Sequence, residues 1–233
     1  MIEDLRKREQ LLRKRIEIAA QKSGRSADDV ELIWVTKTHP VETVEAAIAA
    51  GAKHLGENRI QEAEKKFSKP FPKADLHIIG PVQSNKWRKT AQIAQWVHSV
   101  SRLKALLKFQ EVCVQEDKEI NVLFQINTSL EESKSGLSMK EAKSFILGLP
   151  ELSRVHYRGL MTIGINTGVA EDSREGFAWL RQLRDEVKAE GGEQFQKFTE
   201  LSMGMTGDLE VAVEEGSTML RVGTALFGER NYK

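Results

Sequence analysis

Short apolar runs alternate with longer amphipathic segments from about residue 31 to the end of the chain. Eight of the short runs predict strands, and these are Leu32–Thr36, His54–Gly56, Leu76–Ile79, Trp96–Ser99, Asn121–Ile126, Val155–Leu160, Phe198–Leu201 and Met219–Val222. They are rich in β-branched and aromatic residues, whereas the longer segments repeat apolar residues at helical spacing. This order of strand then helix favours a parallel sheet with helices outside it.

Several helix boundaries carry sequence signals of their own. Pro40 suits the first turn of a helix, and Gly51 suits the position just after its end. Ser138 opens a Ser-x-x-Glu pattern, which is typical of a capping box. Ser101 is placed to cap a helix over Leu103–Val114. These four signals mark the beginning or end of three predicted helices.

The first 22 residues place apolar side chains on one helical face and carry acidic as well as basic residues. They contain no continuous apolar core, so they predict an amphipathic helix over residues 1–22, packed on the domain, and not a signal peptide. No apolar run approaches the roughly 18 residues of a membrane span. We therefore expect a cytoplasmic protein without a membrane partner.

Length and charge narrow the fold and the partners. A chain of 233 residues suits eight strand–helix units in one closed barrel. We predict an α/β protein with a single-domain (β/α)8 TIM-type barrel over residues 1–233, with an open doubly wound sheet as the alternative. The net charge of +1, from 35 Lys and Arg against 34 Asp and Glu, gives no broad basic field for nucleic acid. The one cysteine, Cys113, excludes an intramolecular disulfide and is expected to be packed.

Lys37 is the most distinctive candidate for chemistry. In (β/α)8 enzymes the working groups lie at the carboxyl ends of the strands, and Lys37 directly follows the first predicted strand. Desolvation at a barrel mouth lowers the pKa of a lysine and leaves more neutral amine to attack a carbonyl. The alternative is a lysine that reaches the rim or pairs with a carboxylate such as Glu57.

The last two strand–helix loops predict an anion site. The segment Ser202–Thr206 supplies hydroxyls, a glycine and the start of a helix, and Gly223 and Thr224 supply the same features after the last strand. Unpaired N–H groups at helix starts attract phosphate, and these two loops form the usual phosphate site of the fold. Ordinary turn and cap chemistry is the alternative for each loop taken alone. Arg221 alternates with apolar neighbours in the last strand, so an inward side chain would require an acceptor or a carboxylate partner.

The residues alone leave two ligand classes open. A lysine that forms a Schiff base and faces a phosphate site suits pyridoxal 5′-phosphate (PLP), and it also suits the sugar-phosphate substrate of a lysine-dependent aldolase. No cluster with metal-ligand spacing appears. His54, His77 and His98 each occur singly in a strand-like run, and each is expected to be a core or rim histidine whose hydrogen bonds are satisfied. No metal is predicted.

The chain resembles the pyridoxal-phosphate homeostasis protein family, single-domain relatives of the N-terminal barrel of alanine racemase. The matching segments occur in order along nearly the whole chain. They are Val35–Pro40, Gly56–Glu62, His77–Lys86, Lys134–Gly136, Gly159–Thr162, Leu201–Met205, Gly216–Thr224 and Phe227–Arg230. Two departures from the family pattern are visible. Thr206 stands where serine is expected, and His39-Pro40 follows the lysine where many members have Lys-Pro.

The resemblance implies a cofactor site. It implies a covalent aldimine of PLP on Lys37, with the pyridine nitrogen near Arg221 and Asn58 close to the ring. It assigns Ser202, Gly223 and Thr224 to the phosphate. Because a guanidinium only donates hydrogen bonds, the pyridine nitrogen beside Arg221 would stay unprotonated and the ring would be a weak electron sink.

The function implied by the resemblance is that of a PLP carrier in intracellular vitamin B6 homeostasis and amino-acid balance, with little or no catalysis. The expected partners are PLP and the apoenzymes that receive it, and the expected state is a monomer. The alternative is a PLP-dependent amino-acid racemase. That enzyme would require a second proton-transfer group opposite Lys37, and neither tyrosine, Tyr157 or Tyr232, has a claim to this role.

Overall fold

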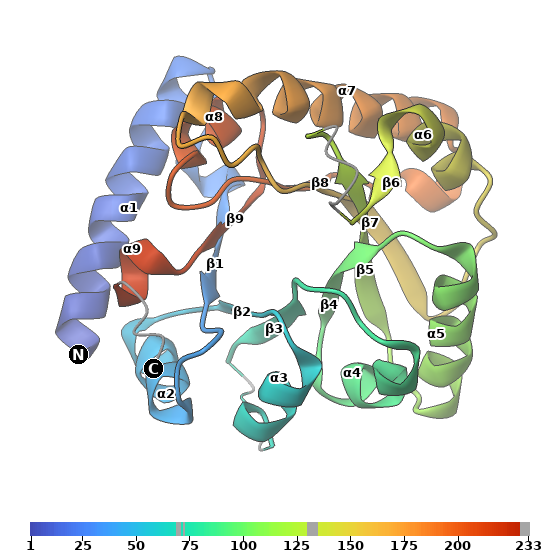
Figure 1. The fold of residues 1–233 in the computed structure, drawn as a ribbon, viewed down its shortest axis with the longest axis horizontal. Helices are drawn as coiled ribbons and strands as arrows, with labels where there is room; N and C mark the ends of the chain where they lie inside the picture. The colour runs from blue at the N-terminus through green and yellow to red at the C-terminus, as the bar shows by residue number, and fades with distance from the viewer. Residues whose placement is uncertain (69–70, 72, 130–134, 229–233) are drawn as a thin grey trace.

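Eight parallel strands close into a barrel in the computed structural model, which describes residues 1–68, 71, 73–129 and 135–228 (Figure 1). The barrel strands are β1 (Glu31–Val35), β2 (His54–Glu57), β3 (Asp75–Ile78), β4 (Trp96–Val100), β5 (Ile120–Asn127), β7 (Val155–Met161), β8 (Glu200–Ser202) and β9 (Met219–Val222). Each strand pairs with the next one along the chain, and the pairing of β1 with β9 completes the ring. The predicted (β/α)8 barrel is confirmed, and the open sheet is excluded.

The helices surround the barrel (Figure 1). They are α1 (Ile2–Lys22), α2 (Val41–Ala50), α3 (Ile60–Lys66), α4 (Trp87–Ile93), α5 (Leu103–Gln115), α6 (Met139–Leu147), α7 (Arg174–Glu190), α8 (Leu209–Glu214) and α9 (Thr224–Phe227). In the part of the chain that is described, no helix is long and apolar enough to cross a membrane. Lys134, Glu229, Arg230 and Tyr232 lie outside the described residues.

Two predicted helix boundaries are confirmed and one is wrong. Gly51 ends α2 in the left-handed conformation with φ 119°, which an L side chain rarely adopts, and the Ser138 side chain accepts a hydrogen bond from the Glu141 N–H at the start of α6. Ser101 does not cap α5, because the residue before that helix is Arg102 and no side chain caps it. A two-residue strand, β6 (Leu137–Ser138), pairs with the end of β5 and was too short to predict.

Buried apolar side chains form two separate clusters. The larger lies between strands and helices and includes Trp34, Phe109 and Phe177. The smaller consists of strand residues only: Ile33, Leu123, Met161 and Met219, with Trp96 packed against them. Ile33 and Trp34 are neighbours in β1 but belong to different clusters, because successive side chains of a strand point to opposite faces. The smaller cluster therefore fills the inside of the barrel.

Helix α1 packs against α8, α2 and α9. Its buried residues are Leu5, Leu12, Ile16, Ala19 and Ala20, which agree with the predicted apolar face except that Ile2 is 38% exposed. An amphipathic helix of 21 residues gains most of its stability from such packing, and not from helix propensity.

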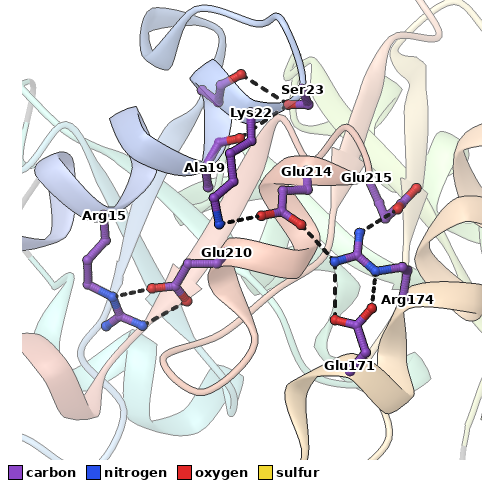
Figure 2. Close-up of polar contacts among 10 residues, drawn as sticks. Arg15, Ala19, Lys22, Ser23, Glu171, Arg174, Glu210, Glu214 and Glu215 are labelled. Atoms are coloured by element: carbon purple, nitrogen blue, oxygen red, sulfur yellow. Dashed lines mark hydrogen bonds and ion pairs between the residues drawn. The ribbon is translucent and has the colours of Figure 1, made fainter.

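Ion pairs join α1 to α8, and α8 to the start of α7 (Figure 2). The Arg15 guanidinium donates to both oxygens of Glu210, with distances of 2.6 and 2.9 Å. Glu214 lies between Lys22 of α1, at 3.2 Å, and Arg174 at the start of α7, at 2.7 Å. The hydrogen bond from Arg174 lowers the pKa of Glu214. These contacts fix α8 between the first helix and α7, next to the loop that follows β8.

Replacing Ile16 with alanine tests the docking of α1. Ile16 is fully buried, so Ile16→Ala should lower the free energy of unfolding by about 2–5 kcal/mol, since it removes methylene groups and leaves a cavity. Ile18 on the same helix is 58% exposed, and Ile18→Ala should change stability by no more than about 0.5 kcal/mol. Chemical denaturation measures both values. Equal losses would contradict the orientation of the helix described here.

Candidate functional site

A buried ion-pair network lies directly behind Lys37. The Lys66 Nζ atom donates to the Thr36 carbonyl at 2.7 Å, to Glu57 Oε1 at 2.9 Å and to Glu62 Oε1 at 2.6 Å. The Thr36 hydroxyl also donates to Glu57 Oε1, at 2.6 Å. Burial raises the pKa of the Glu57 carboxyl against the opposing effect of the Thr36 and Lys66 hydrogen bonds. Glu57 therefore pairs with Lys66, a residue that the sequence analysis did not identify, although its i,i+4 spacing from Glu62 indicates a helical ion pair.

The network separates the roles of two lysines. Lys66 is 7% exposed, and its Nζ atom donates to two carboxylates and a carbonyl, so its hydrogen bonds are all made within the protein. Lys37 is half-buried and follows the strand β1. The next residue, Thr38, has a φ of 69°, and its N–H donates to Glu62 Oε1 at 2.5 Å. Lys37 is thus held between two residues, Thr36 and Thr38, that the network fixes.

Arg221 points into the barrel, as the alternation in the last strand predicts. It is 5% exposed and donates to the Ser202 carbonyl at 2.7 Å, the Ser202 hydroxyl at 2.8 Å and the Thr162 carbonyl at 2.8 Å. Burial lowers the pKa of Arg221 to about 10, while the charge of Asp208 opposes that change, so the side chain stays cationic at neutral pH. A guanidinium has five N–H groups. Within the described residues these three bonds leave two N–H groups of Arg221 for a ligand.

The three strand histidines contact one another inside the barrel. His54 Nδ1 lies 3.0 Å from His77 Nε2, and His77 Nδ1 lies 2.9 Å from His98 Nε2. His98 Nδ1 in turn lies 2.9 Å from the Ser202 hydroxyl. The expectation that they are satisfied core or rim histidines holds, because each is satisfied by its neighbours. No group of three or more side chains that could hold a metal occurs among the residues described.

The loops that follow β8 and β9 lie side by side. The Arg221 N–H donates to the Gly204 carbonyl at 3.0 Å, and the Ala225 N–H donates to the Thr206 hydroxyl at 3.4 Å. Ser202 is fully buried, and its hydroxyl bonds to Arg221 and His98, so its side chain turns into the barrel. The expected helix dipoles are weak here, because α8 has six residues and α9 four. An anion would therefore depend on individual N–H and hydroxyl donors.

A hollow opens at the carboxyl end of the barrel beside Asn58. It has a volume of about 190 Å³, and its lining includes Asn58, Gly80, Gln125 and Asn127. A Cβ atom added to Gly80 would lie 2.2 Å from the Asn58 carbonyl oxygen and 2.6 Å from its Oδ1. Only glycine fits at this position, and its absence of a side chain lets Asn58 lie across the end of β3.

The amino-acid sequence matches a known family over almost its whole length. Residues 9–231 match the model described as alanine racemase, N-terminal domain. The chain belongs to this family. It is 40% identical over 217 residues to the pyridoxal phosphate homeostasis protein of Vibrio alginolyticus, and the match covers 91% of each chain. The resemblance drawn from the sequence motifs is confirmed.

Solved structures of similar sequence share the fold. One is an unknown protein from Bifidobacterium adolescentis, with a TM-score of 0.88 and 35% identity, covering 97% of this chain and 95% of that one. Another is PipY of Synechococcus elongatus with PLP bound, with a TM-score of 0.78 and 33% identity, covering 86% and 93%. The match thus extends from sequence motifs to the arrangement of the whole barrel.

The predicted site residues occupy one arc of this alanine racemase-type barrel. The strands β2, β1, β9 and β8 are consecutive neighbours in the ring. Asn58, Lys37 and Gly223 follow the first three of these strands, and Ser202 ends the fourth. Thr224 adjoins Gly223 and is exposed, while Arg221 lies on β9 below them and contacts Ser202. The fold therefore brings all six positions to adjacent strand ends.

Gly204 is the residue on which the shape of the β8 loop depends most. Its φ is 93°, and an added Cβ atom would lie 2.5 Å from the Ala212 Cβ and 2.7 Å from Leu220 Cδ2. Gly204→Ala should therefore lower the free energy of unfolding by about 1–3 kcal/mol, through backbone strain and overpacking. Gly207→Ala in the same loop meets no atom within 4 Å and should leave stability unchanged or raise it by up to about 1 kcal/mol. Thermal and chemical denaturation of both variants distinguish the two effects, and equal stabilities would refute the role given to Gly204.

Proposed function

We propose that the protein binds PLP covalently through Lys37 and acts as a PLP carrier in vitamin B6 homeostasis and amino-acid balance. The observation that carries the proposal is the arc of Lys37, Arg221 and the two loop ends at one mouth of the barrel. Support also comes from the relatives named pyridoxal phosphate homeostasis protein and from PipY, which was solved with PLP bound.

The donors on this arc fit a phosphorylated pyridine aldehyde. PLP supplies an aldehyde that condenses with a primary amine, with loss of water, to a C=N bond. Lys37 provides the amine, and the two remaining N–H groups of Arg221 suit the lone pair of the pyridine nitrogen. We assign Gly223 and Thr224, with Thr206, to the phosphate, and Asn58 to the ring. Ser202 contributes through Arg221, because its hydroxyl already bonds to Arg221 and His98.

The charge of Arg221 supports the carrier role. Arg221 stays cationic at neutral pH, and a guanidinium can only donate hydrogen bonds. A protonated pyridine nitrogen would find no acceptor in Arg221, so a protonated ring beside it is disfavoured. An unprotonated ring withdraws electrons from a bound amino acid only weakly, and bonds at its Cα carbon are then hard to break. The residues around the cofactor are suited to holding it and not to transforming it.

An amino-acid racemase is the second candidate, since the family takes its description from alanine racemase. Such an enzyme requires a base on the face opposite Lys37. The Tyr157 hydroxyl donates to the Pro150 carbonyl at 2.7 Å, and its ring packs against Phe124 and Phe195 in the layer between strands and helices. Burial raises the pKa of this tyrosine. Tyr157 is therefore unsuited to the role.

An absorption spectrum with borohydride reduction tests covalent binding. Wild-type protein incubated with PLP should turn yellow, and reduction should fix the mass of the cofactor on the peptide that contains Lys37. Lys37→Ala should lose both signals, because it removes the half-buried amine that follows β1. Lys104→Ala, which changes an exposed lysine on α5, is the control and should retain them. A wild type that stays colourless would refute the proposal and favour a lysine-dependent aldolase.

The rate at which single enantiomers of amino acids lose their chirality distinguishes a carrier from a racemase. Holoprotein incubated with single enantiomers of alanine and other amino acids should racemise them no faster than free PLP does, because a weak electron sink and a missing second base both disfavour proton removal. Chiral chromatography over time gives the rate. Turnover well above that of free PLP would favour the racemase. Delivery of PLP to apoenzymes, a monomeric state and a cytoplasmic location remain predictions of the proposal.

A further inference from the structure

A line of polar contacts, hydrogen bonds except for the first ion-pair contact, crosses the inside of the barrel. It starts at Glu31, whose Oε2 atom lies 3.3 Å from His54 Nε2 at the amino-terminal end of β1 and β2. It ends where Arg221 donates to the Ser202 hydroxyl, at 2.8 Å. Between these ends lie the three histidine contacts of 3.0, 2.9 and 2.9 Å already described. In order, its members are Glu31, His54, His77, His98, Ser202 and Arg221, which we call the histidine chain.

The register of the strands produces this line. His54 pairs with Asp75, and His77 lies two residues further along β3. His77 pairs with Trp96, and His98 lies two residues further along β4. A step of two residues keeps the side chain on the same face of the sheet, so all three imidazoles enter the barrel, each one nearer to its carboxyl end. Each ring presents Nδ1 to the next member of the chain.

A neutral imidazole has one N–H donor and one acceptor, so the hydrogens of such a chain can all point in only one of two directions. Burial, and the charges of neighbouring groups, lower the pKa of His77 and of His98 well below the usual value, so both rings are neutral. The direction of the chain is then decided at its two ends.

Both ends favour the same direction. The Glu31 carboxylate is negative and can only accept, so its position 3.3 Å from His54 Nε2 favours hydrogen on that nitrogen. His54 Nδ1 is then an acceptor for His77 Nε2–H, and His77 Nδ1 is an acceptor for His98 Nε2–H. At the other end Arg221 only donates, so the Ser202 oxygen accepts from it. Among the described residues the other partner of this hydroxyl is His98 Nδ1, so its hydrogen finds an acceptor by pointing there.

We propose that Glu31 and Arg221 fix the histidine chain in one direction, with hydrogen on Nε2 of all three rings, and that this chain holds the Ser202 hydroxyl and Arg221 in place for a ligand acceptor. Hydrogen bonds aligned in one direction polarise one another, so the charge at Glu31 strengthens the bond that Ser202 offers to His98. Glu31 is then a positioning residue for the far end of the barrel. The ligand part of this inference rests on the proposed function, whereas the direction of the chain does not.

The direction is measured in apoprotein labelled with ¹⁵N in histidine, through long-range ¹H–¹⁵N correlation spectra. His77 and His98 should each show a protonated Nε2 and an unprotonated Nδ1. The opposite chain, with a charged His54 that donates at both nitrogens, requires hydrogen on Nδ1 of His77 and His98. That result in the wild type would overturn the proposal.

Glu31→Gln tests the control of direction from the rim. The Glu31 side chain is 48% exposed, and a glutamine amide can donate as well as accept, so the variant should fold and His54 and His77 should show a mixture of tautomers. Glu119→Gln is the matched control, because Glu119 faces His156 across 3.1 Å outside the chain. It should leave His54, His77 and His98 unchanged. Unchanged tautomers in Glu31→Gln, or equal changes in both variants, would overturn the role of Glu31.

The same two variants loaded with PLP test the ligand part. Glu31→Gln should shift the absorption maximum or the pH midpoint of bound PLP, because Arg221 and Ser202 lose part of their fixed orientation, and Glu119→Gln should not. A wild type with the expected tautomers but no bound PLP would refute the proposed function and leave the chain direction intact. Bound PLP with identical spectra in all three proteins would instead overturn the positioning of the ligand by the chain.

Discussion

The cation of Arg221 is the constraint on which the inside of this barrel depends. A buried guanidinium must find acceptors, and here it finds two backbone carbonyls and a hydroxyl in place of a carboxylate. The carbonyl of Ser202 also accepts from the Thr162 N–H, so the same atoms that join β7 to β8 hold the cation. The Arg221 backbone N–H donates to the Gly204 carbonyl, so the loop after β8 is fixed relative to β9.

Lys66 is a second buried cation that needs acceptors, and it lies on the outer face of β1 and β2. In a closed barrel, polar side chains can gather at the ends of the strands. The network of Lys66 with Glu57 and Glu62 lies on the outer side of the ends of β1 and β2. Removing one member of a buried ion pair leaves an uncompensated charge, so such a network is rigid in geometry even where its net stabilisation is small. Its effect on function is to fix the backbone on either side of Lys37.

The sequence was sufficient for the features that depend on one strand or one helix at a time. The alternation of strands and helices predicted the barrel, and the strand ends gave the positions at which candidate groups such as Lys37 were sought. The sequence alone did not predict the histidine chain or the inward orientation of the Ser202 side chain, because both depend on the register between strands. Period-2 alternation gives the face on which His77 lies, but not that His54 and His98 lie two residues away in register. The cap at Ser101 failed for a local reason, because the helix starts one residue later than its side chain can reach.

The two buried networks give different electrostatic surroundings to the two ends of the candidate site. Behind Lys37 two carboxylates surround one ammonium, whereas behind Arg221 the histidine chain brings no negative charge close to the guanidinium. An acceptor presented to Arg221 would meet a guanidinium that stays cationic at neutral pH. Proton transfer at such a site would have to come from a residue that moves or titrates. His77 and His98 are neutral and their nitrogens bond to each other, to His54 and to Ser202, so they serve the structure of the site and not the transfer of protons to a ligand.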